Sequence, residues 1–134
     1  MMGTDERSLS RAIRVKAETA QLARIRSFVE EVASGLALDV ERIFDLKVAV
    51  SEACANAVEH AGCEQALLEV DACVHEQRLT FVVTDTGLFH PPTLPRQSHQ
   101  SRGLGLPLMV ALMDEVSFAR IPGGGTAVSL SVLL

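Results

Sequence analysis

Residues 51–61 read SEACANAVEHA and lie at the end of a long amphipathic pattern. Apolar residues recur at three- and four-residue intervals from about Val40 to Ala61, which predicts one helix over that range. Asp39 stands where an N-cap is expected, and Gly62 where a helix commonly ends. The apolar stripe of this helix comprises Ile43, Leu46, Val50, Ala53 and Ala57.

The same helix carries a polar stripe of Glu52, Asn56, Glu59 and His60, spaced so that they share one face. An amide oxygen is a hard neutral ligand that suits Mg²⁺, and a carboxylate one turn away can orient or accept a proton. A solvated helix face is an equally ordinary interpretation of these four residues. For His60 we expect a structural role.

The rest of the chain follows the same periodicities. We expect strands over 12–17, 66–74, 79–84, 116–121 and 126–133, and further helices over 18–35 and 104–113. Segment 86–102 holds three prolines and is expected to be an irregular loop. This order predicts an α+β fold: a two-layer sandwich with helices on one face of a mixed, mainly antiparallel sheet. One domain is expected over 9–134, after a disordered tail at 1–8.

Composition and charge argue against several classes of function. The chain of 134 residues is 48% apolar and 22% charged, with a net charge of −5 and no basic block, so direct nucleic-acid binding is not expected. No apolar run approaches the roughly 20 residues that span a bilayer, so we expect a cytoplasmic protein that binds no membrane. Cys54, Cys63 and Cys73 fit neither a zinc site nor a disulfide framework and are expected to be free thiols.

Two glycine-containing segments offer further chemistry. Asp85 ends a hydrophobic strand, where its carboxylate can accept a hydrogen bond from an exocyclic amine such as that of adenine. Gly87 would let a flat ring approach the backbone. Gly103 and Gly105 stand where the loop becomes a helix, and exposed N–H groups at such a point bind anions. Each segment alone is also typical of an ordinary turn or helix start, and neither matches a Rossmann or Walker A motif.

The order of these motifs along the chain resembles the GHKL family of ATP-binding domains, with its Bergerat-type pocket. Within that superfamily, residues 51–61 look like the N box of the bacterial anti-sigma-factor serine kinases, and residues 112–116 and 125–128 strengthen that match. The resemblance implies a serine/threonine protein kinase that uses ATP and Mg²⁺. Such a kinase phosphorylates a STAS-type anti-sigma-factor antagonist and sequesters a sigma factor, and so regulates transcription by partner switching.

The resemblance also assigns roles to individual residues. It makes Glu52 the catalytic base or an orienting carboxylate, and Asn56 the ligand of a Mg²⁺ ion that bridges the ATP phosphates. It places Asp85 on the adenine amine, Gly87 beneath the ring, and Thr126 in support of Asp85. Backbone contacts to the phosphates are expected from Gly103, Leu104 and Gly105. The position of Arg102 beside them, and not the resemblance, suggests that it approaches the γ-phosphate when the loop closes.

The sequence departs from the family pattern in two places. The first glycine box lacks a second glycine, which favours the anti-sigma branch over other ATPases of the family. The segment between Phe89 and Arg102 is short, which leaves little lid over a nucleotide and keeps alternatives open. One alternative is a nucleotide-sensing partner-switch module that binds proteins without transferring phosphate. Another is a sibling kinase that regulates a phosphatase or a sensory scaffold. Homodimerisation is expected from the resemblance only.

Overall fold

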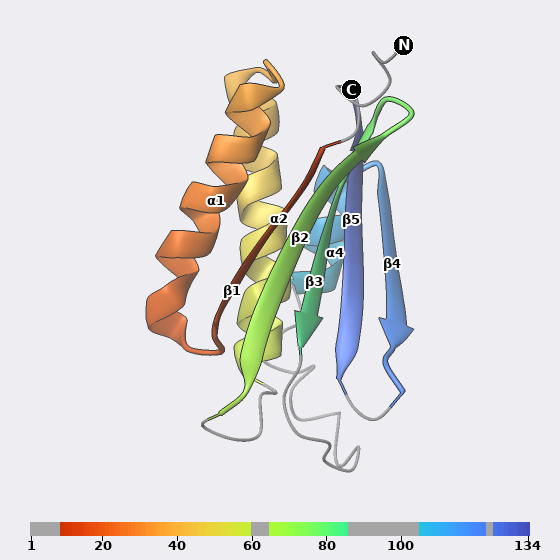
Figure 1. The fold of residues 1–134 in the computed structure, drawn as a ribbon. Helices are drawn as coiled ribbons and strands as arrows, with labels where there is room; N and C mark the ends of the chain where they lie inside the picture. The colour runs from red at the N-terminus through yellow and green to blue at the C-terminus, as the bar shows by residue number, and fades with distance from the viewer. Residues whose placement is uncertain (1–8, 60–64, 86–104, 123–124) are drawn as a thin grey trace.

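A computed structural model describes residues 9–59, 65–85, 105–122 and 125–134. Five strands form one sheet, and the helices α1, α2 and α4 pack against one of its faces (Figure 1). The strands are β1 (Ser10–Lys16), β2 (Leu67–His75), β3 (Arg78–Asp85), β4 (Glu115–Arg120) and β5 (Thr126–Leu133). The helices are a short 3₁₀ turn, η2 (Thr19–Gln21), followed by α1 (Leu22–Gly35), α2 (Val40–Glu59) and α4 (Gly105–Leu112). The predicted two-layer α+β fold is confirmed.

The strand order is β1-β2-β3-β5-β4, and every pairing between these strands is antiparallel. The expectation of a mixed sheet is therefore wrong for the described strands. Helix α4 carries the chain back along the sheet, so that β4 runs in the same direction as β3 (Figure 1). The return strand β5 then inserts between β3 and β4, which keeps the two parallel strands from pairing.

The core lies between the helices and the sheet. Alternate residues of β2 and β3 are buried, as expected for strands with one covered face. Phe81 of β3 is fully buried and meets Phe28 of α1 edge to face, with ring centroids 6.4 Å apart. Helix α2 lies between α1 and α4 and buries Leu46, Val50 and their neighbours against the sheet.

Element boundaries differ from expectation in two informative places. Helix α1 begins at Leu22 instead of residue 18, because a 3₁₀ turn precedes it. The expected four-residue turn at 75–78 is shorter: only Glu76 and Gln77 connect β2 to β3, and both have positive φ, 54° and 68°. Two-residue hairpin turns of this kind favour Asn-Gly, so the sequence Glu-Gln does not predict such a turn.

The N-cap of α2 is confirmed, because the Asp39 carboxylate accepts a hydrogen bond of 2.8 Å from the backbone N–H of Arg42. Replacing Asp39 by alanine leaves that N–H without its acceptor. We expect the free energy of unfolding to fall by about 1 kcal/mol, measured by urea denaturation. Asp39→Asn should retain most of the stability, and equal losses in both variants would contradict a capping role.

The described cysteines behave as expected for free thiols. Cys54 is buried in α2, and burial raises the pKa of its thiol to about 12, so it stays protonated at neutral pH. Cys73 is exposed on β2, and Cys63 lies outside the described residues. Among the described helices, none is long and apolar enough to cross a membrane.

Candidate functional site

A cavity of about 160 Å³ lies between α2 and the covered face of the sheet. It is lined by Ala53, Asn56, Ala57, Val83, Asp85, Phe118, Thr126 and Val128. Three of these residues were predicted from the sequence to serve one site. The fold thus brings Asn56, Asp85 and Thr126 together from a helix and two strands that are far apart in sequence.

Sheet register explains why Asp85 and Thr126 meet. Thr84 pairs with Ala127, so the last residue of β3 and the first residue of β5 follow at the next position of the ladder. Strand β3 ends where β5 begins, and at this end of the two strands Asp85 is half-buried and Thr126 is exposed. The carboxylate therefore lies at the end of a strand, as the sequence predicts.

The helical wall of the cavity is made of small residues. The apolar stripe of α2 carries large side chains at Leu46 and Val50 but alanines at Ala53 and Ala57. An alanine fills less of the space between helix and sheet than a leucine does. The C-terminal half of α2 therefore leaves a gap above the sheet, and the amide of Asn56 borders that gap.

The other predicted site residues lie outside this cavity or outside the described residues. Glu52 is half-buried on α2, one turn before Asn56, and does not line the cavity. Gly105 begins α4, as the expected helix start requires. The remaining predicted contacts, Gly87, Arg102, Gly103 and Leu104, fall outside the described residues. The described residues thus include part of the predicted adenine contacts and part of the predicted phosphate contacts.

Sequence reasoning gave no individual role to two residues, one that contacts the backbone of Asp85 and one that lines the cavity. Gly125 has a φ of 94°, and a Cβ on it would overlap the backbone carbonyl oxygen of Asp85. The glycine run that ends at Gly125 was a signal of close backbone approach. The second residue is Phe118 of β4, a cavity-lining aromatic that is 51% exposed. Nothing in its strand pattern distinguishes it from a core residue.

Residues 15–132 match the family described as the histidine kinase-like ATPase domain. The chain belongs to this family. ATP binding follows from that membership, and the cavity bordered by Asn56 and Asp85 lies within the matched range.

Curated relatives place this ATPase domain more narrowly. The serine-protein kinase RsbW of Bacillus subtilis is 37% identical over 118 residues, covering 78% of this chain and 74% of the relative. The anti-sigma F factor of Caldanaerobacter subterraneus subsp. tengcongensis is 30% identical, covering 79% and 80%. The predicted resemblance to the anti-sigma-factor kinases is therefore confirmed, and so is the predicted serine/threonine protein kinase class.

Solved structures support the fold of the domain. A Mycobacterium tuberculosis protein with RsbU and RsbW domains matches with a TM-score of 0.72 at 23% identity. The match covers 94% of this chain, which spans about a third of that structure (32%). A histidine kinase domain from Erythrobacter litoralis matches with a TM-score of 0.57 at 24% identity, covering 86% of this chain and 60% of that one. Both likenesses concern the fold alone.

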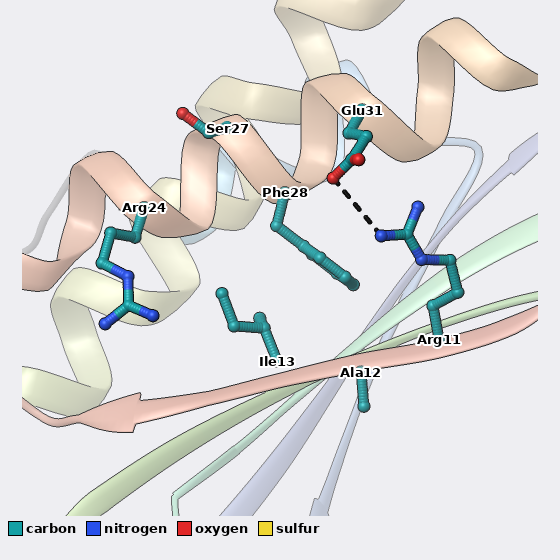
Figure 2. A pocket seen from close by; sticks show the side chains of 7 residues that line it. All are labelled: Arg11, Ala12, Ile13, Arg24, Ser27, Phe28 and Glu31. Carbon is teal, nitrogen blue, oxygen red and sulfur yellow. Dashed lines mark hydrogen bonds and ion pairs between the residues drawn. The ribbon is translucent and has the colours of Figure 1, made fainter.

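A second, larger cavity of about 390 Å³ lies elsewhere on the ATPase domain, between β1 and α1. The side chains of Ile13 and Phe28 point toward each other across it, and Arg11 contacts Glu31 at 3.3 Å (Figure 2). The guanidinium of Arg11 also lies 5.5 Å from the ring centroid of Phe28. Size alone would favour this cavity as the ligand site. None of the predicted nucleotide-binding residues lines it, so chemistry favours the smaller one.

Proposed function

We propose that this chain is an ATP-dependent serine/threonine protein kinase that acts as an anti-sigma factor. It phosphorylates a STAS-type anti-sigma-factor antagonist and sequesters a sigma factor. The observation that carries the proposal is the cavity at which Asn56, Asp85 and Thr126 meet. The names of the relatives, serine-protein kinase RsbW and anti-sigma F factor, support the choice of partners. Sigma factors act in the bacterial cytoplasm, so the proposal places the protein there. By resemblance to the family, the proposal also includes a homodimer.

The adenine base occupies the described cavity in this proposal. The Asp85 carboxylate accepts a hydrogen bond from the exocyclic amine, and Thr126 supports it from the neighbouring strand. Val83 and Val128 supply the apolar floor that a flat base requires. Gly87, by resemblance, lies beneath the ring.

Asn56 is the proposed ligand of the Mg²⁺ ion that accompanies the ATP phosphates, and Glu52 is proposed to act in the transfer step. The described residues contain no cluster of three His, Cys, Asp or Glu that holds a metal by itself. Mg²⁺ in kinases is commonly bound by one or two protein ligands together with the phosphates, so a single carboxamide oxygen at Asn56 fits it. When bound, Mg²⁺ neutralises charge that develops on the phosphate oxygens. Arg102, Gly103, Leu104 and Gly105 are proposed to contact the same phosphates.

Glu52 is the proposed general base, the group that accepts the proton of the substrate hydroxyl. The substrate hydroxyl oxygen attacks the γ-phosphorus and forms a new O–P bond. The bond from the γ-phosphorus to the bridging oxygen breaks, and ADP leaves with that electron pair. The hydroxyl proton passes to the Glu52 carboxylate, one helical turn from Asn56. Phosphoryl transfer depends mainly on positioning and charge stabilisation, so this modest set of groups is sufficient.

Calorimetric titration with ATP, with and without Mg²⁺, tests the pocket. Replacing Asp85 by asparagine places an amide where the carboxylate meets the adenine amine. We expect affinity for ATP to fall about 10- to 100-fold, the loss typical of a hydrogen bond to a charged group. The matched control is Asp71→Asn, because Asp71 lies on β2 between the buried Val70 and Ala72 and so faces away from the helices. Equal affinity of Asp85→Asn and wild type would refute the adenine assignment.

Phosphate transfer to a purified STAS-type antagonist tests the activity. Incorporation of ³²P from labelled ATP into a serine or threonine of the antagonist is the expected result. Binding of ATP and of the antagonist without any transfer would support the partner-switch module instead. Transfer without capture of a sigma factor in a pull-down would favour a sibling kinase with other partners.

A further inference from the structure

Phe118 is the one aromatic residue among those that line the described cavity. It lies on β4, directly opposite Val128 of β5, which in turn pairs with Val83 of β3. These three side chains form a single row across the sheet, on the face that the helices cover. All three line the cavity, so the row is its continuous apolar floor.

Phe118 differs from the other two members of this row in its exposure. Val83 is 1% exposed and Val128 is half-buried, whereas Phe118 is 51% exposed. Two residues earlier on the same face of β4, Val116 packs against the core. Phe118 therefore lies where the core ends and the cavity begins. A large apolar ring in this position is half in contact with water unless something covers it.

The opposite wall suits a flat ligand. Ala53 and Ala57 of α2 face the sheet with side chains of one carbon each, and Asp85 closes one end of the space with an acceptor. An apolar cavity of roughly 150 Å³ accommodates an aromatic ring such as benzene. The cavity of 160 Å³ is thus of the size that holds an aromatic base rather than a whole nucleotide.

We propose that Phe118 is a base-contacting residue whose ring packs against the adenine and sets the affinity of the site for nucleotide. This inference rests on the proposed function and adds to it a residue that the family resemblance does not assign. Contact between an aromatic side chain and a base typically strengthens binding by roughly 5- to 150-fold. Asp85 would fix the edge of the base while Phe118 covers its apolar surface.

The first test is the affinity of Phe118→Ala for ATP and ADP. We expect both to weaken by the same factor, about tenfold or more, because the lost contact is to the base that they share. Phe44→Ala is the matched control. Phe44 is 63% exposed on α2 and lines neither described cavity, so its variant should bind both nucleotides like the wild type. The thermal midpoint of each ligand-free variant checks that both are folded.

The second test uses fluorescence. The chain contains no tryptophan and no tyrosine, so Phe118→Trp introduces a single indole at the cavity. Its emission is expected to change on addition of ADP and to saturate with the dissociation constant found by calorimetry. Phe44→Trp should show no change. The two readouts are independent, since one deletes the ring and the other enlarges it.

Each outcome decides the matter. Weakened binding by Phe118→Ala, together with a saturable signal from Phe118→Trp, supports the assignment. If wild type and Phe118→Ala bind ATP equally, or the indole does not respond while ADP binds, the assignment is wrong and the proposed function stands. If the wild type binds no ATP, the proposed function fails and the assignment fails with it.

Discussion

Replacing Glu52 by alanine is expected to lower the rate of phosphate transfer to the antagonist by about 10²- to 10⁴-fold, the usual contribution of a positioned general base. Affinity for ATP should change little, because Glu52 does not line the cavity that is assigned to adenine. The variant would therefore separate binding from chemistry. Single-turnover ³²P transfer at saturating ATP measures the rate, and calorimetry measures the affinity.

Two further variants sharpen the interpretation of Glu52. Glu52→Gln keeps the size of the side chain and removes its basicity, so it should be nearly as slow as Glu52→Ala if the carboxylate takes the proton. Asp45→Ala, two turns earlier on the same helix, is the control and should transfer phosphate at the wild-type rate. Undiminished transfer by Glu52→Ala would exclude the residue as the base.

Replacing Gly125 by alanine is expected to reduce the free energy of unfolding by about 2–4 kcal/mol, from steric overlap and an unfavourable φ together. A Cβ on Gly125 would collide with the carbonyl oxygen of Asp85, which is backbone and has no rotamer to change. Either β3 or the connection from β4 to β5 must then shift. A shift on either side changes the placement of Asp85 relative to Thr126, so ATP affinity should fall together with stability. Urea denaturation and calorimetry measure the two effects.

Gly35→Ala is the matched control for this variant. Gly35 ends α1, and a Cβ on it would meet no atom within 4 Å. Alanine is favoured over glycine within a helix, so Gly35→Ala should be neutral or slightly stabilising and should bind ATP normally. A Gly125→Ala protein as stable as Gly35→Ala would show that the backbone at Asp85 tolerates displacement.

The local elements of this fold could be read from the sequence because each has a periodic pattern or a specific cap. The helix ending in residues 51–61 was predicted with its N-cap, and the apolar alternation of β2 and β3 was predicted to within two residues. Asp85 was placed correctly at the end of a strand. These features depend on neighbours along the chain, and such neighbours are visible in a single sequence.

The prediction of the site residues depended on motifs and not on periodicity. Asn56, Asp85 and Thr126 were named from motifs, whereas Glu52 was named with them but does not line the cavity that they share. No pattern in β4 marked Phe118, because an inward-facing aromatic on a strand is usually a core residue. Its position at a cavity follows from the alanines on α2, which lie about 60 residues earlier in the chain.

The sequence alone predicts which segments are helices and strands, and it names candidate side chains for the site. The folded structure was needed to show that β5 inserts between β3 and β4, that all described strand pairs are antiparallel, and that Gly125 approaches Asp85 closely. The reason is physical. Periodicity and capping arise from contacts within a few residues, whereas sheet order, cavity shape and steric exclusion arise from contacts between segments that only the folded chain brings together.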